Sequence, residues 1–210
     1  MKLAIFGATG RTGKQLVEQA LQQGHEVIAF ARNPAKLGIQ HERLKVVEGD
    51  VYKAEDVERA VVGADAVMMA LGHTKGTTTK DVLTVATKNV LAAMKKHNVR
   101  RLVNITGAGV ADPNDRPRLF NKVMSFLLKR MAGDLLADSQ CQSEAIRWSD
   151  LDWVIVRVPM LTDGPKTGHV RVGYVGQGTG ARITRADAAD FMLKLVTDTT
   201  YLRKAPMISN

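Results

Sequence analysis

The sequence has a single cysteine, no long apolar run and no obvious membrane or export signal. Cys141 alone forms no internal disulfide and no two-cysteine metal knuckle, and it fits a reducing compartment. No stretch reaches the roughly 18 uninterrupted apolar residues of a membrane helix, and the apolar run after Met1 is too short for a signal sequence. We therefore expect a soluble cytoplasmic protein with no metal site and no membrane partner.

The chain also lacks internal repeats, low-complexity tracts and any Pro/Gly/Ser-rich linker. Its 210 residues are close to the usual size of one domain. Hydrophobic residues make up 45% of the chain and charged residues 24%, which is ordinary for a globular protein and excludes wholesale disorder. We expect one domain over residues 1–210.

Acidic residues are fewer than basic ones, 21 against 30, so the formal charge is +9. This charge favours anionic ligands. Phosphorylated cofactors, acidic pigments and nucleic acid are all anionic and therefore remain candidates. The basic residues are scattered and aromatic residues amount to only 5%, a poor pattern for a nucleic-acid surface. We expect no nucleic-acid partner.

Short apolar segments alternate with helical periodicity along the chain. Alternating strands and helices predict an α/β fold with a single doubly wound parallel sheet and helices on both faces. The expected strands span residues 3–6, 26–31, 44–48, 66–70, 101–106 and 153–158. The expected helices span residues 14–23, 53–62, 80–98, 135–148 and 185–196.

Residues 112–133 interrupt this alternation. Apolar residues from Leu119 to Met131 recur at three- and four-residue spacing, which predicts a separate amphipathic helix. Such a helix packs on the edge of the core or forms a mobile lid over a substrate, and burial is the commoner reason for an apolar stripe. We expect this inserted segment to border the substrate site.

Gly7, Gly10 and Gly13 lie at a spacing of three between the first strand and the first helix. In this context glycines allow a tight turn, close backbone approach to a pyrophosphate and close packing of helix on strand. A glycine triplet is also compatible with a plain structural turn. The strand-turn-helix setting favours a dinucleotide site of the Rossmann type.

The second strand ends without the carboxylate that an NAD enzyme offers to the adenosine ribose. Arg32 stands there instead, and Lys36 follows one helical turn later. Two cations suit the 2′-phosphate of NADP, and Arg11 is a further candidate for it. The alternative is ordinary solvated surface charge. We expect NADP(H) rather than NAD as the cofactor.

Three motifs together resemble the atypical short-chain dehydrogenase/reductases, and in particular their flavin reductase and biliverdin-IXβ reductase group. They are residues 5–13 (IFGATGRTG), residues 49–51 (GDV) and the pair Leu71 and Gly72. Residues 89–95, 149–157 and 161–165 extend the likeness over nearly the whole chain. The resemblance implies an NADPH-dependent reductase of flavins or bilins, and a monomer.

The resemblance also assigns the cofactor residues. Asp50 would contact adenine or, alternatively, cap the following helix. The set comprises Gly7, Thr9, Gly10, Arg11 and Thr12 at the pyrophosphate, Arg32 and Lys36 at the 2′-phosphate, Asp50 and Val51 at the adenine, Leu71 and Gly72 at the nicotinamide ribose, and Pro159, Met160 and Leu161 at the carboxamide.

The sequence departs from the family in three places. Residues 135–148 contain neither the tyrosine nor the lysine of the Tyr-x-x-x-Lys pair, so sugar epimerase or alcohol dehydrogenase chemistry is not expected. Gly107 replaces a family serine after Thr106, and Ser139 replaces a family histidine. These departures leave the family's usual substrate contacts without their side chains.

The remaining chemistry is transfer of a hydride to a planar acceptor stacked on the nicotinamide. Thr106 would lie beside the nicotinamide, and Gly107 would leave space for a flat ring. His73 is the histidine placed to donate a proton, unless water or the substrate supplies it. Arg116 and Arg118 would meet a flavin phosphate or bilin propionates, or else be exposed helix charges.

Two functions follow from these residues. The first is an NADPH-dependent oxidoreductase whose partner is a small-molecule acceptor, with FMN as a substrate or bound flavin. The second is a non-catalytic NADP(H)-binding sensor or scaffold, which the missing family serine and histidine favour.

Overall fold

The computed structural model describes residues 1–73, 80–117 and 119–210, and for residues 119–132 it describes the backbone alone. The strands of the main sheet are Lys2–Phe6 (β1), Glu26–Ala31 (β2), Leu44–Glu48 (β3), Ala66–Met69 (β4), Arg101–Gly107 (β5), Asp152–Val158 (β6), Arg171–Gly173 (β8) and Met207–Ser209 (β10). Met160–Thr162 (β7) and Arg182–Thr184 (β9) form a second sheet. The helices are Arg11–Gln22 (α1), Ala54–Val61 (α2), Val82–Lys96 (α3), Leu119–Arg147 (α4) and Arg185–Lys194 (α5), with a short 3-10 helix at Pro34–Lys36 (η1).

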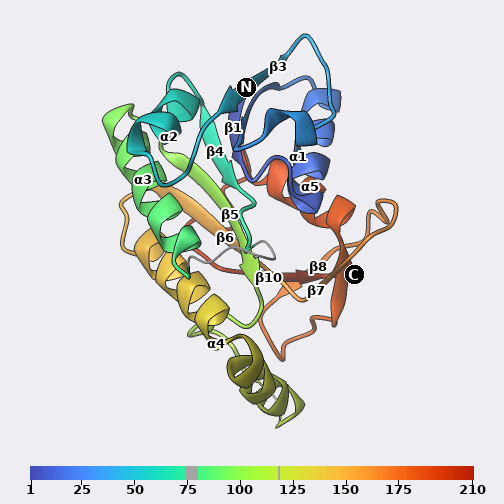
Figure 1. The fold of residues 1–210 in the computed structure, drawn as a ribbon. Coiled ribbons are helices and arrows are strands. Elements are labelled where there is room, and N and C mark those ends of the chain that lie inside the picture. The colour runs from blue at the N-terminus through green and yellow to red at the C-terminus, as the bar shows by residue number, and fades with distance from the viewer. Residues whose placement is uncertain (74–79, 118) are drawn as a thin grey trace.

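The strand order of the main sheet is β3-β2-β1-β4-β5-β6-β10-β8. Neighbours from β3 through β10 run parallel, and β8 joins the edge antiparallel to β10. Helices cover both faces (Figure 1). The predicted doubly wound parallel sheet is therefore confirmed, with the small β7–β9 sheet as an addition.

The two faces of the sheet bury alternate residues of the same strands. In β1, Ile5 belongs to the apolar cluster that contains Leu16 of α1 and Met192 of α5. Its neighbour Phe6 belongs to the opposite cluster with Val90 of α3. Because both faces are covered, the strands are apolar throughout instead of alternating with polar residues.

α4 is one continuous helix, and the expectation of two separate helices in residues 112–148 is wrong. Residues 112–117 precede the helix, and the turns before and after Gly133 are joined. A glycine in a helix interior costs about 1 kcal/mol relative to alanine but does not interrupt the hydrogen-bond ladder. The side chains of the apolar stripe at 119–131 lie outside the described residues. Among the described residues, no helix is long and apolar enough to cross a membrane.

Asp187 joins the C-terminal segments to the start of α5. Its carboxylate accepts hydrogen bonds from Thr167 N (3.0 Å), Gly168 N (2.9 Å), Thr184 Oγ1 (2.7 Å) and Asn210 Nδ2 (2.9 Å). Burial by itself raises the pKa of Asp187, but the hydrogen bonds from Thr184, Gly168 and Thr167 lower it to about 2. The charged carboxylate thus holds three chain segments together.

We predict that the Asp187 carboxylate makes the free energy of unfolding depend on pH in the acid range. Because the folded pKa is below the unfolded value, its contribution is complete above about pH 4 and is lost as the pH falls toward 2. The midpoint of urea unfolding should fall over this window in the wild type. Asp187→Asn should lower the midpoint at pH 7 and flatten its dependence between pH 4 and 2. Equal acid dependence of the two proteins would contradict the assignment.

Candidate functional site

The turn between β1 and α1 is packed so closely that two of its glycines have no room for a side chain. Gly7 has φ +79°, and a Cβ there would lie 2.4 Å from the carbonyl oxygen of Ala70. A Cβ on Gly13 would lie 2.0 Å from the carbonyl oxygen of Gly7. The helix-on-turn packing expected of the third glycine is therefore present, and the turn rests against the end of β4.

The N-terminus of α1 faces this turn without the usual capping group. Within the described chain, Gly10 at the N-cap makes no side-chain cap hydrogen bond, and the first turn of α1 carries no acidic residue. The first N–H groups of a helix and its positive dipole end then favour an anion. This is an observed feature that fits a pyrophosphate.

A pocket of about 590 Å³ opens beside the turn. It lies where the strand order reverses, between β1 and β4, which is the usual ligand crevice of a doubly wound sheet. Its lining residues are Gly7, Thr9, Gly10, Phe30, Ala31, Arg32, Asn33, Lys36, Val51, Ala70, Leu71, Gly72 and Val82.

Two exposed cations stand at the β2 end of the pocket. Arg32 follows the last residue of β2, and Lys36 closes η1. Asn33 fixes the start of η1, because its Oδ1 accepts a hydrogen bond from Ala35 N at 3.1 Å. The lining residues that the structure describes include no carboxylate. This end of the pocket is therefore cationic.

Val51 lines the pocket, whereas Asp50 does not. The alternative role of Asp50 as the N-cap of α2 is wrong, because the N-cap position is Lys53. Asp50 Oδ1 instead accepts a hydrogen bond from Tyr52 N at 3.1 Å, and Asp50 N donates to Asp56 Oδ2 at 2.9 Å. A carboxylate that bonds the backbone two residues on forms a turn of its own, which competes with capping a later helix.

Arg11 and Thr12 lie on α1 but are not among the pocket's lining residues. Arg11 Nη1 lies 3.2 Å from Asp163 Oδ2, and Asp163 also pairs with Arg185 at 2.6 Å. Thr12 is buried. The Arg11 guanidinium thus points to the segment after β7.

The expected acceptor-side residues lie at or after the carboxyl ends of β4, β5 and β6, which are neighbours in the sheet. Thr106 is buried and Gly107 is exposed, with open space where a Cβ on Gly107 would lie. Met160 is 61% exposed. The 590 Å³ pocket is lined by none of Thr106, Gly107, His73, Pro159, Met160 and Leu161 among these described residues.

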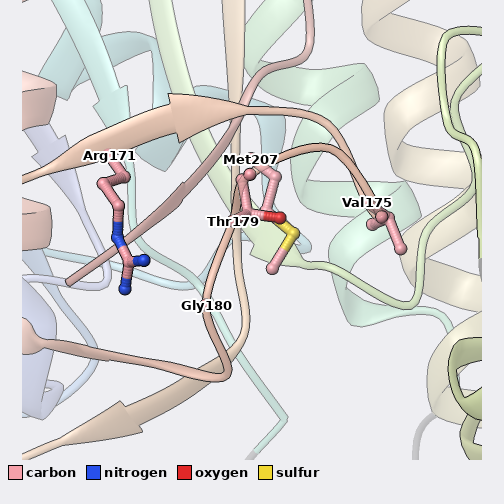
Figure 2. Close-up of a pocket in the computed structure, with 7 residues that line it drawn as sticks. Arg171, Val175, Thr179, Gly180 and Met207 are labelled. Carbon is pink, nitrogen blue, oxygen red and sulfur yellow. The ribbon is translucent and has the colours of Figure 1, made fainter.

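Arg116 lines a different hollow, of about 240 Å³, together with Tyr174 and Gln177. Its N–H donates to Val175 O at 2.9 Å, which ties the 113–116 loop to the turn after β8. Arg118 lies outside the described residues. A further hollow of about 310 Å³ adjoins this turn; Thr179 and Met207 lie together in it, with Arg171 and Val175 on either side (Figure 2).

A buried ion pair anchors these loops to the sheet. Arg157 of β6 is fully buried, and its Nη1 and Nη2 each donate to an Asp115 carboxylate oxygen at 2.7 Å. Arg157 Nε also donates to Ala205 O at 2.8 Å. Asp115 Oδ1 in turn accepts from Val175 N at 3.0 Å. The pair fixes the 110–117 loop against both β6 and the turn after β8.

Sequence reasoning missed several residues of the site. The residues that line the pocket but were not nominated are Phe30, Ala31, Asn33, Ala70 and Val82. Asn33 stands between Arg32 and a proline, so its turn-forming residue type was the available signal. Val82 begins α3, whose approach to the pocket depends on tertiary packing that local sequence does not reveal.

The chain matches the family model described as "NAD(P)H-binding" over residues 7–199. The uncharacterized protein YwnB of Bacillus subtilis is 33% identical over 186 residues, which cover 82% of this chain and 79% of that protein. A short-chain dehydrogenase/reductase of Veillonella parvula, solved in complex with NADP, has a TM-score of 0.80 at 19% identity and covers 100% of this chain and 94% of its own. ChuY of Escherichia coli O157:H7, described as an anaerobillin reductase, has a TM-score of 0.78 at 20% identity and covers 100% of this chain and 97% of its own.

The two solved structures establish the fold. The glycine turn, the uncapped start of α1 and the cationic pocket agree with the nucleotide binding that the family description states. The match covers most of the chain and includes the turn itself. The chain therefore belongs to the NAD(P)H-binding family.

Proposed function

We propose that this protein is an NADPH-dependent oxidoreductase that reduces a planar acceptor such as a bilin or a flavin. The observation that carries the proposal is the 590 Å³ pocket, because it joins an anion-binding helix end to a cationic end without a carboxylate. Membership of an NAD(P)H-binding family supports it. ChuY, which has the same fold, is described as an anaerobillin reductase, and this supports the acceptor class.

The residues present fit NADPH. The turn at Gly7, Thr9 and Gly10 and the start of α1 would bind the pyrophosphate, with Arg11 and Thr12 as its neighbours. Arg32 and Lys36 would bind the 2′-phosphate, since a carboxylate at that position would repel it. Asp50 and Val51 would border the adenine, and Leu71, Gly72, Pro159, Met160 and Leu161 would border the nicotinamide half.

NADPH, when bound, supplies a hydride to the acceptor. Thr106 and Gly107 would then form the base of the acceptor site, where the open space at Gly107 admits a flat ring. His73 would donate the proton that accompanies reduction. Arg116 and Arg118 would attract an acidic acceptor, and the N-terminal part of α4 would form one side of its site. We propose a small-molecule partner, no nucleic-acid or membrane partner, and a monomer.

Anaerobic oxidation of NADPH by purified protein tests this function. Biliverdin, FMN and riboflavin are compared as acceptors, with an enzyme-free control and with NADH in place of NADPH. We expect saturable turnover with at least one acceptor and a preference for NADPH. If the protein binds NADPH tightly but turns over none of the acceptors, the alternative function, a non-catalytic NADP(H)-binding sensor or scaffold, is favoured. The missing Tyr-x-x-x-Lys pair also favours that alternative.

We predict that Arg32→Ala lowers NADPH affinity by about 10- to 100-fold, because charge-assisted hydrogen bonds are worth about 1.5–3 kcal/mol. NADH affinity should be unchanged, since NADH lacks the 2′-phosphate. Lys88→Ala, at an exposed cation of α3 away from the pocket, should leave both affinities unchanged. Fluorescence titration measures both constants, and an unchanged NADPH affinity in Arg32→Ala would refute the contact.

A further inference from the structure

A histidine and a buried carboxylate meet where β4 ends and α4 passes. His73 Nε2 lies 3.0 Å from Asp138 Oδ2, and the two side chains are 15% and 2% exposed. His73 immediately follows Leu71 and Gly72, which line the cofactor pocket. His73 Nε2 and Asp138 Oδ2 are at hydrogen-bond distance but poorly aligned, as is common in catalytic sites before reactants bind.

Asp138 is held in place independently of His73. Its Oδ2 accepts a hydrogen bond from Leu83 N at 2.9 Å, and its Oδ1 accepts from Thr84 N at 2.9 Å and Thr84 Oγ1 at 2.6 Å. These donors belong to the first turn of α3, whose dipole favours a negative charge. The carboxylate is therefore fixed in position by donors from α3.

The rest of the α4 face reinforces this placement. Gln142, one turn after Asp138, donates to Thr87 Oγ1 at 3.1 Å and accepts from Asn104 Nδ2 at 3.4 Å. Asp138 and Gln142 are both buried, so α4 is locked to α3 and β5 by polar contacts. A carboxylate held this way can orient a partner ring without moving.

Two other charged groups just before α3 have partners of their own. Lys80, just before α3, pairs with Asp134 of α4 at 2.7 Å. Asp81 accepts a hydrogen bond from the Tyr52 hydroxyl at 3.0 Å. Asp138 is therefore the carboxylate that the structure brings to His73.

We infer that Asp138 is the positioning residue for His73. It holds the imidazole with a proton on Nε2 and thereby leaves Nδ1 to exchange a proton with the acceptor. The inference rests on the proposed reductase function. Two electrons reach the acceptor as a hydride. The doubly protonated His73 ring gives its Nδ1 proton to the acceptor, and the neutral ring that remains keeps its Nε2 proton beside Asp138. Water then returns a proton to Nδ1.

The ring's protonation state tests the inference without any acceptor. Long-range proton–nitrogen correlation spectra, assigned with His73→Gln, should show the neutral His73 ring protonated at Nε2. In Asp138→Asn, an amide N–H replaces the acceptor, so the neutral ring should change to the Nδ1-protonated form. Thr84→Val removes a donor to Asp138 but leaves His73 alone, so it should keep the wild-type tautomer. A wild-type ring protonated at Nδ1, or a tautomer unaffected by Asp138→Asn, would overturn the inference.

Kinetics then tests whether the pair acts in the reaction. His73→Gln should lower kcat by about 100-fold, as expected for loss of a general acid. Asp138→Asn should lower kcat by about 10-fold or more with little change in the KM for NADPH, because it misorients the ring. The double variant should be no slower than His73→Gln, whereas multiplied losses would overturn the coupling. If the wild type turns over no acceptor, the proposed function fails, while the spectra still decide the placement of the ring.

Discussion

Gly13→Ala is expected to weaken NADPH binding by about 100-fold or more. The new methyl group would lie 2.0 Å from the Gly7 carbonyl oxygen and 2.9 Å from the Ala8 Cα, so backbone must move to admit it. The atoms that move form the turn on which the pyrophosphate would rest. Losing one or two charge-assisted hydrogen bonds there, each worth about 1.5–3 kcal/mol, weakens binding by about 100-fold or more. Isothermal titration with NADPH measures the loss.

The matched control is Gly133→Ala, because a Cβ at Gly133 in α4 would meet open space. This variant should bind NADPH like the wild type and gain about 0.5–1 kcal/mol in the free energy of unfolding, since alanine favours helix. Circular dichroism shows whether Gly13→Ala is folded. A folded Gly13→Ala protein with wild-type affinity would show that the turn is only structural.

Arg157→Met should lower the free energy of unfolding by about 3–5 kcal/mol, because it leaves the Asp115 carboxylate, only 13% exposed, without its partner. The guanidinium makes two 2.7 Å contacts with Asp115 and further contacts with Ala205 O and Val110 O (3.1 Å). Its loss frees the 110–117 loop from β6. Denaturant unfolding at pH 7 measures the effect.

A surface ion pair serves as the control for this prediction. Arg100 lies 3.3 Å from Asp152, but the two side chains are 54% and 42% exposed. Arg100→Met should therefore cost at most about 1 kcal/mol. The double variant Arg157→Met/Asp115→Leu should recover part of the loss, because it removes the unpaired charge as well. Equal losses in Arg157→Met and Arg100→Met would contradict the anchoring role.

Much of the fold could be predicted because its signals are local. Apolar runs and helical periodicity located the six central strands, and the boundaries of β2 and β3 match the prediction. The strands β7 to β10 have three residues each, too few for a period to appear. Their pairing depends on distant partners such as Asp187 and Asn210. The continuity of α4 was missed because Gly133 was taken as a boundary.

Part of the candidate site could likewise be predicted from local sequence, and part depends on tertiary packing. The glycine turn and Arg32 with Lys36 are contiguous in sequence, so their residue types alone indicated a phosphate-binding site. His73 and Asp138 are brought together only by the packing of α4 on α3, and no local pattern joins them. Contacts of this kind become visible only when the tertiary structure is known.

Titration of the wild-type protein with NADPH and with NADH in a calorimeter tests the central claim most directly. The pocket residues predict one site per chain, with NADPH bound at least about 10-fold more tightly because Arg32 and Lys36 bind the extra phosphate. Equal affinities for the two nucleotides, or no binding of either, would contradict the claim that this pocket holds NADPH.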